Sequence, residues 1–279
     1  MLTTAARSQV WVVIERCAKT RAQKPLADGT LAPRHSPRSI NAAIRTVKAI
    51  WNKGLDWEVV DCRNRAAKLE EVPETAKPSK ARKALTVDEV LRIAAECPDG
   101  RDRTMIVVLG LTGMRLAEAA GLTRDCIDLE ERTVEVRRQW DSFGPRPTKT
   151  HATGAVPMTM TLTRALQWWH AQRRSDIVFA LRRNPERPVH TNLWREKKFR
   201  PAARRAGMPE VTPHQLRHTF RSLLRVAGAD QTLAKELLRH STDDMSLYYA
   251  HTYAGEARSV VDRIDDLIGT DAPEKGVTQ

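Results

Sequence analysis

Residues 211–251 read VTPHQLRHTFRSLLRVAGADQTLAKELLRHSTDDMSLYYAH, and they open on a strongly marked helix start. Thr212 has the hydroxyl that an N-cap needs, and Pro213 fits the first helical position, where the missing N–H costs nothing. Gln215 stands at the third position of a capping box. The sequence therefore predicts a helix that begins at about residue 213.

Charged side chains are expected on one face of this helix. Leu216 and Phe220 recur at helical spacing and are predicted to face the core. His214, Arg217 and Arg221 fall about opposite to them. Free backbone N–H groups and the positive end of the helix dipole also favour an anion at a helix start. The pattern thus predicts a cationic row that faces an anion.

The composition favours a polyanionic partner. The chain has 279 residues, of which 41% are hydrophobic, enough for a buried core, and its formal net charge is +13. Residues 1–85 carry 17 basic and 8 acidic side chains, and residues 173–205 carry 11 and 3. Solubility alone accounts for some excess of lysine and arginine, but two concentrated basic blocks point to nucleic acid.

Cysteine usage and apolar runs exclude several classes of protein. The four cysteines are widely spaced, at Cys17, Cys62, Cys97 and Cys126. Because none forms a C-x-x-C pair, neither a zinc knuckle nor a disulfide framework is predicted, and a cytoplasmic location fits. The longest apolar run, residues 105–114, is too short to span a bilayer, and the N-terminus has no signal-peptide pattern.

A basic linker divides the chain into two blocks. Apolar residues recur at helical spacing over residues 10–17 and 40–51, with prolines in residues 34–39 between them. Lysine, proline and serine then dominate, as in an exposed linker. The predicted divisions are a small helical domain over 1–75, the linker over 76–84, a larger domain over 85–255, and a C-terminal helix and tail over 256–279.

The larger domain opens on helices and a bend. Thr86 and Glu89 form a capping-box pattern that predicts a helix from about Val87. A second apolar helix over residues 102–111 runs into Gly113, where the chain is expected to bend, and this places Arg115 at the bend.

A small sheet and two further helices are predicted next. Alternating residues indicate strands over Thr133–Val136 and Val156–Met160, joined by a polar loop that contains Lys149. Residues 162–172 and 193–206 read as helices, and the second is strongly basic.

Five motifs occur in order along the larger domain: Thr112-Gly113-Met114-Arg115-Leu116-Ala117-Glu118, Lys149-Thr150, His214-Gln215-Leu216-Arg217-His218, Leu238-Arg239-His240 and Tyr249-Ala250-His251. In order and spacing they resemble the motif set of the tyrosine recombinases, the phage integrase family. The first block is similar to a short version of that family's core-binding domain. The resemblance implies a mainly α fold with a small β-sheet, an α+β class shared with type IB topoisomerases.

The resemblance also implies a role for each motif. Arg115 and Arg217 would clamp the non-bridging oxygens of a scissile DNA phosphate, and Lys149 would be the general acid for the leaving 5′-hydroxyl. His214 and His240 would donate hydrogen bonds and assist proton movement. Two guanidiniums can meet the charge on the equatorial oxygens without a metal, so no metal or other cofactor is expected.

Two adjacent tyrosines compete for the role of nucleophile. The family places the nucleophile nine residues after the histidine of its Leu-Gly-His motif, and the count from His240 selects Tyr249 over Tyr248. A 3′-phosphotyrosine would conserve the phosphodiester energy, which fits the absence of a Walker-type glycine loop from the sequence. Arg239 departs from the family by replacing glycine, and it would either displace His240 or add a phosphate contact.

Simpler interpretations compete with these roles. Arg115 and Lys149 are also consistent with solvated surface charges. Glu118 is expected to support the bend rather than take part in chemistry. His214 and His218 have the i, i+4 spacing of a zinc pair, but Gln215 stands where such a motif has glutamate, so His218 is interpreted as a helix-packing residue.

The sequence thus predicts a site-specific DNA recombinase that acts on double-stranded DNA. The resemblance implies a homo-tetramer on two duplexes, with accessory DNA-bending proteins as further partners. Apolar positions from Val260 to Ile268 form a stripe suited to docking either on a neighbouring copy or on the chain's own domain. The alternatives are a monomeric type IB topoisomerase and a catalytically silent DNA-binding protein of the same fold.

Overall fold

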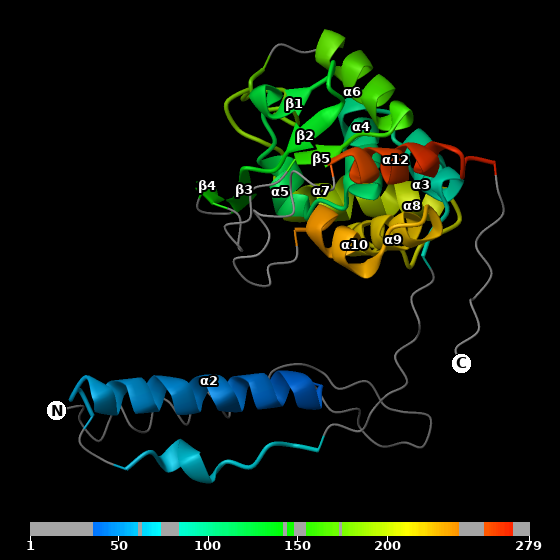
Figure 1. Ribbon diagram of the computed structural model, residues 1–279. Helices are drawn as coiled ribbons and strands as arrows, with labels where there is room; N and C mark the ends of the chain where they lie inside the picture. The colour runs from blue at the N-terminus through cyan, green and yellow to red at the C-terminus, as the bar shows by residue number, and fades with distance from the viewer. Residues whose placement is uncertain are drawn as a thin grey trace. The chain divides into compact units, whose positions relative to one another are not determined.

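The computed structural model describes residues 36–60, 63–73, 84–141, 144–147, 155–172, 175–239 and 254–269. The chain divides into two compact units, Met1–Lys80 and Ala81–Gln279. The described residues are mainly α-helical, as the sequence predicted, and they contain two small antiparallel sheets where one was expected (Figure 1).

In the first unit, the described residues form a long helix, α2, which spans Pro37–Asp56. Ser36 caps it by accepting a hydrogen bond from the N–H of Ser39. The predicted separator over residues 34–39 therefore ends inside a helix, because proline at the first helical position starts a helix as readily as it interrupts one. The predicted helix over residues 10–17 lies outside the described residues.

A returning segment lies along α2 and is fixed by a buried amide. Asn41 Nδ2 donates to the carbonyl oxygen of Val72 at 2.9 Å, and Asn41 Oδ1 accepts from Val72 N at 2.8 Å. A 3-10 turn over Arg65–Lys68 interrupts this segment. These two hydrogen bonds hold the returning segment against α2.

Helices make up most of the second unit. Those within the described residues are α3 (Val87–Ala95), α4 (Gly100–Thr112), α5 (Leu116–Ala120), α6 (Met160–Gln172), α7 (Thr191–Trp194), α8 (Arg200–Arg205), α9 (Pro213–Val226), α10 (Gln231–Leu237) and α12 (Ala254–Asp265). The predicted capping box starts α3: Glu89 N donates to Thr86 Oγ1 at 3.1 Å, and Thr86 N donates to Glu89 Oε2 at 2.9 Å. None of the described helices is long and apolar enough to cross a membrane.

Helix α4 is the centre of the second unit. All of its residues except Gly100 and Arg103 are buried. Three helices, α3, α6 and α9, pack against α4 and cover it on its different sides, as a helix that is buried all round requires. The bend after α4 and the start of α9 are thereby held against the same rigid element.

The basic segment predicted as one helix consists of three pieces. A π-helical turn, Arg195–Phe199, separates α7 from α8. Pro201 has no N–H to donate to the carbonyl four residues earlier, which accounts for the widened turn before it.

Two sheets lie between α5 and α6. β1 (Ile127–Asp128), β2 (Thr133–Glu135) and β5 (Ala155–Pro157) form an antiparallel sheet in the order β1-β2-β5. β3 (Arg138–Asp141) pairs with β4 (Gly144–Pro147) in a hairpin that was predicted as loop. Prolines argue against a central strand, but β4 is paired on one side only, where proline is tolerated. The second predicted strand ends at Pro157, because α6 starts at Met160.

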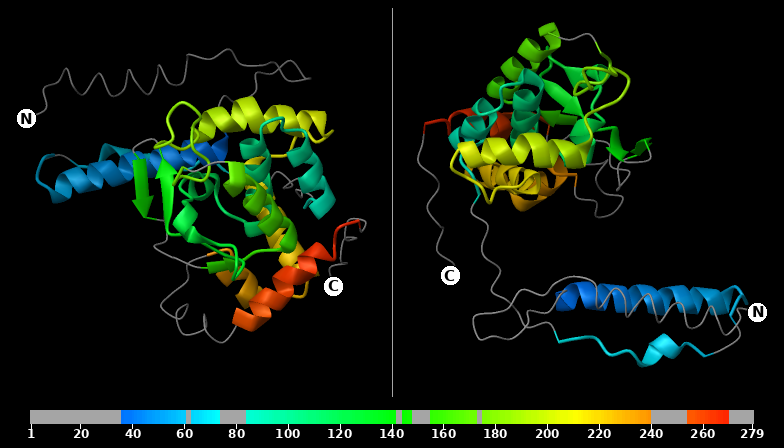
Figure 2. Two further views of the ribbon diagram at one scale, coloured as in Figure 1. Left: turned by 90° about the horizontal axis from the view of Figure 1, so that it is seen from above. Right: turned by 180° about the vertical axis from the view of Figure 1, so that it is seen from behind.

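Helix α12 packs on its own unit, which is one of the two positions that the sequence left open. Val260, Val261 and Ile264 are fully buried, and α12 contacts both α6 and α9 (Figure 2). Asp265 Oδ2 accepts from Met160 N at 2.5 Å, so α12 also caps the start of α6. Ile268, at the end of the predicted stripe, is 40% exposed.

Candidate active site

The site is organised around the bend between α4 and α5. Gly113 ends α4 in the left-handed conformation, with φ of 62°. A Cβ at this position would lie 2.6 Å from Phe220 Cδ1 and 2.8 Å from Leu238 Cδ2. Glycine is therefore required both by the backbone angle and by the close packing of α9 and of the end of α10 against the bend.

Arg115 follows the bend and is paired with Glu118. The backbone N–H of Arg115 donates to Glu118 Oε2 at 2.9 Å, and Arg115 Nη1 donates to Glu118 Oε1 at 2.6 Å. The Glu118 side chain is 1% exposed, whereas that of Arg115 is 30% exposed. Glu118 thus supports the bend, as expected, and it also fixes the orientation of a guanidinium that still reaches solvent.

Arg217 comes from the second turn of α9 and is buried, which corrects the prediction that it shares an outward face with His214. Its Nη1 donates to the carbonyl oxygen of Gly113 at 2.6 Å, and its Nη2 donates to that of Leu238. Because α9 packs against both α4 and α10, Arg217 is covered at the edge of the apolar stripe, whereas His214 and Arg221 stay exposed. Arg217 therefore ties three segments of the site together.

Arg239 replaces the family's glycine, and its side chain turns into the protein. Its φ is 53°, the left-handed value that glycine would adopt at the end of α10. Arg239 Nη2 lies 3.3 Å from Glu118 Oε2, and Nη1 donates to the carbonyl oxygen of Leu237 at 3.1 Å. Because Arg239 is only 5% exposed, the structure argues against one of the two alternatives, a contact with a DNA phosphate; the other, a displaced His240, lies outside the described residues.

These residues form a cluster of three guanidiniums around one carboxylate, in which only Arg115 is partly exposed. We call it the arginine cluster: Arg115, Glu118, Arg217 and Arg239. Arg217 Nη1 lies 4.0 Å from Glu118 Oε2, so the single carboxylate is shared by all three cations. Burial, with the charges of Arg115 and Arg239, lowers the pKa of Arg217 to about 10. Three guanidiniums and one carboxylate give the cluster two formal positive charges in excess, which are left for an anion.

The histidines of the third motif lie on the surface of α9. His214 and His218 are both exposed, and their ring centroids are 4.8 Å apart in an edge-to-face arrangement. His218 is therefore not a residue of the core, although its ring packs against that of His214. Among the described residues, no three His, Cys, Asp or Glu side chains are grouped as metal ligands.

The structure brings together two of the six predicted site residues, Arg115 and Arg217, and places His214 one turn earlier on α9. Lys149, His240 and Tyr249 lie outside the described residues, as does Tyr248. Arg239 was predicted only as a departure from the family. An arginine where the family has glycine was the feature of the sequence that could have identified Arg239 as a further residue of the site.

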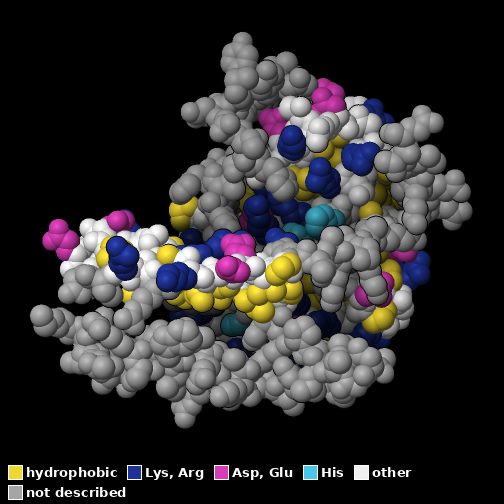
Figure 3. Space-filling view, turned by 90° about the horizontal axis from the view of Figure 1, so that it is seen from below, with side chains coloured by type: hydrophobic (Ala, Val, Ile, Leu, Met, Phe, Trp, Pro, Cys, Tyr) yellow, Lys and Arg dark blue, Asp and Glu magenta, His cyan; other side chains and the backbone are white. Residues whose placement is uncertain are grey.

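Basic side chains are exposed beside this site and on the segment from α7 to α8, and they gather with histidines on the face shown in Figure 3. Some are paired: Arg200 lies 2.6 Å from Glu196, and Arg205 lies 3.1 Å from Glu96. Lys197 and Arg204 are exposed and have no ion pair within the described part of the chain. The segment therefore offers charges suited to a polyanion.

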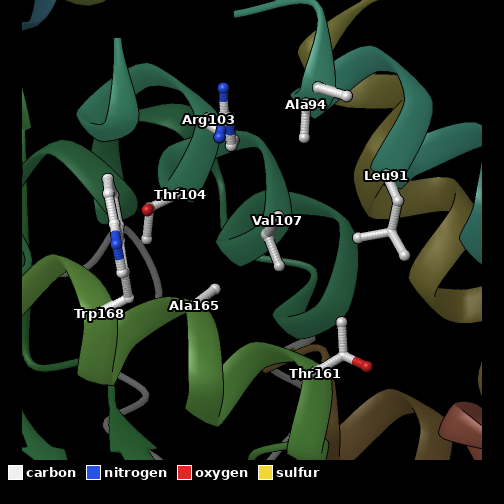
Figure 4. Close-up of a pocket in the computed structure, with 9 residues that line it drawn as sticks. Leu91, Ala94, Arg103, Thr104, Val107, Thr161, Ala165 and Trp168 are labelled. Carbon is white, nitrogen blue, oxygen red and sulfur yellow. The ribbon is translucent and has the colours of Figure 1, made fainter.

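A separate pocket lies between α3, α4 and α6 (Figure 4). Its walls are mostly apolar, with Leu91, Val107 and Trp168 among them, and Arg103 is the one charged residue in its lining. No predicted site residue lines it. A polyanion is therefore expected at the arginine cluster rather than here.

Known proteins resemble this chain over most of its length. The sequence profile of the Phage integrase family matches residues 83–256. The tyrosine recombinase XerA of Pyrococcus furiosus is 29% identical over 84% of this chain and 78% of its own length. The tyrosine recombinase XerC of Mycobacterium bovis is 30% identical over 71% of this chain and 67% of its own length.

Solved structures share the fold. The Tn1549 transposon integrase in complex with transposon right-end DNA aligns with a TM-score of 0.61 and 21% identity, over 83% of this chain and 81% of that one. A lambda integrase dimer bound to a COC′ core site aligns with a TM-score of 0.54 and 17% identity, over 88% and 91%. With the family profile covering the arginine cluster and all five motifs, the chain belongs to the phage integrase family, the tyrosine-type DNA strand breaking and rejoining enzymes.

Proposed function

We propose that this chain is a site-specific recombinase that cleaves and rejoins duplex DNA through a covalent 3′-phosphotyrosine. The observation that carries the proposal is the arginine cluster, in which Arg115 and Arg217 converge on Glu118 with positive charge in excess. Curated relatives are named tyrosine recombinases, and a transposon integrase of the same fold was solved with transposon-end DNA. These names support DNA as the substrate.

In this proposal Arg115 and Arg217 hold the scissile phosphate. Arg115 is partly exposed and fixed by Glu118, so its remaining N–H groups are available to a non-bridging oxygen. Arg217 has two of its donors on backbone carbonyls and contributes its charge from behind the site. Developing negative charge on the equatorial oxygens is stabilised most by donors that are already fixed in place.

Tyr249 is the proposed nucleophile. Its oxygen attacks the phosphorus, the bond to the 5′-oxygen breaks, and Lys149 gives a proton to that oxygen. His214 and His240 donate hydrogen bonds to the phosphate and assist the removal of the tyrosine proton. Because a free tyrosine has a pKa of about 10, nearby cations must favour the phenolate during attack. Attack by a 5′-hydroxyl reverses the reaction, so no nucleotide is consumed.

The proposed partner is double-stranded DNA, bound both by the small helical domain over 1–75 and by the basic segment that includes Lys197 and Arg204. Phosphate contacts would supply most of the affinity. Strand exchange between two duplexes would require a tetramer, and DNA-bending proteins would help to assemble it. The catalytic domain is proposed to span 85–255, after the linker over 76–84.

Nicked suicide DNA tests this proposal, because loss of a short fragment after cleavage traps the covalent adduct. We expect the parent protein and Tyr248→Phe to form the adduct, and Tyr249→Phe to form none because it lacks the attacking oxygen. No adduct with the parent would instead favour a silent DNA-binding protein. Relaxation of supercoiled plasmid without a specific site would favour the type IB topoisomerase.

A further inference from the structure

Arg239 is a charged residue in a place that ordinarily takes glycine. Few residues other than glycine adopt its φ of 53°, and its side chain is only 3% exposed, against 6% for Arg217. Its Nε is buried and has no hydrogen-bond partner within the described residues. A side chain that served only to fill space would not need this charge, so the contacts of its guanidinium decide what it does.

The main contact of Arg239 is with Glu118. Arg239 Nη2 approaches Glu118 Oε2 at 3.3 Å, on the same oxygen that accepts the backbone N–H of Arg115. Burial alone raises the pKa of Glu118, but the charge of Arg239 and the hydrogen bonds from Arg115 outweigh it and lower that pKa overall. Among the lowering interactions, that with Arg239 is the largest.

The ionised form of Glu118 matters to Arg115. Both carboxylate oxygens accept from Arg115, one from the backbone N–H and one from Nη1. A protonated carboxyl would turn one of these acceptors into a donor and weaken the grip on the guanidinium. The state of Glu118 therefore sets the orientation of the only guanidinium in the arginine cluster that is substantially exposed.

We propose that Arg239 is a positioning residue for strand cleavage, which acts through Glu118 to hold Arg115 and adds a third positive charge behind the phosphate. The inference rests on the proposed function, because it concerns the cleavage step. With glycine at this position the cluster would keep one net positive charge, and with arginine it keeps two. The left-handed backbone angle is unfavourable for arginine, and the attraction between the Arg239 guanidinium and Glu118 offsets that cost.

Single-turnover cleavage of nicked suicide DNA across a range of pH tests the inference, with Arg239→Gly, Arg239→Met and Arg239→Lys. Arg239→Gly relieves the backbone angle, Arg239→Met keeps its strain without the charge, and Arg239→Lys keeps the charge. Because the Glu118 pKa is depressed, activity that needs the carboxylate is retained above that pKa and lost as pH falls through it. Removing Arg239 raises that pKa, so the acid limb of the rate profile moves to higher pH.

We expect Arg239→Gly and Arg239→Met to cleave on the order of tenfold to a hundredfold more slowly at neutral pH, because misplacement of a phosphate ligand has effects of this size. The acid limb moves upward in both variants, and Arg239→Lys restores it at least in part. DNA binding, measured in a Tyr249→Phe background to prevent chemistry, changes less than the cleavage rate. Thermal unfolding of each variant separates these effects from loss of folded protein.

An acid limb that stays in place in Arg239→Gly and Arg239→Met, while the parent forms adduct, would overturn the inference and leave the proposed function standing. Equal rates for Arg239→Lys and Arg239→Met would also overturn it, since the charge would then have no role. If the parent forms no adduct at any pH, the proposed function fails and the inference fails with it.

Discussion

At the scale of single residues, the site depends on positions where the backbone admits little choice. Gly113 lets α9 and the end of α10 approach the bend that carries Arg115. Arg217 uses two of its donors to hold the carbonyls of Gly113 and Leu238, so the bend and the segment before His240 share one guanidinium. Substitution of Gly113 is therefore expected to disturb Arg217, and substitution of Arg217 is expected to disturb the bend at Gly113.

Gly113→Ala is predicted to destabilise the protein strongly. The left-handed angle alone costs alanine about 1 kcal/mol. Overpacking against Phe220 and Leu238 adds roughly 1–3 kcal/mol. Gly207→Ala is the matched control, because Gly207 also has a positive φ, of 80°, but no atom lies within 4 Å of its added Cβ.

Urea unfolding of the two variants measures the difference. Gly207→Ala is expected to lose only the cost of the backbone angle, and Gly113→Ala several times as much. Equal losses of unfolding free energy in the two variants would mean that Phe220 and Leu238 do not restrict the side chain at position 113.

At the scale of secondary-structure elements, the sequence predicted where helices begin more accurately than it predicted which helix faces are buried. The capping residues of α3 and α9 were predicted because capping depends on neighbours in the sequence. The burial of Arg217 was not predicted, because it depends on α4 and α10, which come from other parts of the chain. The β3–β4 hairpin was missed because its prolines are typical of loops.

The cluster shows the same limit. The motifs predicted Arg115 and Arg217 by their spacing and the resemblance. That Arg239 turns inward to Glu118 could not be predicted, because its partner lies 121 residues away in the sequence.

Helix α12 offers a test at this scale. Ile264 is fully buried, so Ile264→Ala is expected to lower the free energy of unfolding by roughly 2–5 kcal/mol. Ile268→Ala is the control, because that side chain is 40% exposed and should lose much less. Since α12 packs on its own unit, the loss should not depend on protein concentration. A loss that grows on dilution would show that α12 is shared between molecules.

At the scale of the whole molecule, the net charge of +13 is expected to govern affinity for DNA. Each phosphate that a lysine or arginine neutralises steepens the fall of affinity with salt by about one unit of slope on logarithmic axes. The exposed, unpaired charges of the segment from α7 to α8 are the ones predicted to act in this way.

Lys197→Gln combined with Arg204→Gln is predicted to lower the slope by about two units on duplex DNA, because two phosphate contacts are lost. Fluorescence anisotropy across a salt series measures it. Lys235→Gln, which removes an exposed charge from α10 outside the basic segment, serves as the control. The slope is expected to change little in Lys235→Gln. If this control changed the slope by half as much as the double variant or more, each charge would act alike wherever it lies, and a DNA-binding role for this segment would be contradicted.

The central claim is that Tyr249 forms the covalent bond to DNA. Mass spectrometry of the trapped adduct tests it directly, after nuclease treatment leaves a short nucleotide remnant and trypsin releases the peptide of residues 240–258. Fragmentation separates the three tyrosines of the chain, Tyr248, Tyr249 and Tyr253, all of which lie in that peptide. The remnant is predicted on Tyr249, and a remnant on either of the other two tyrosines would contradict the account.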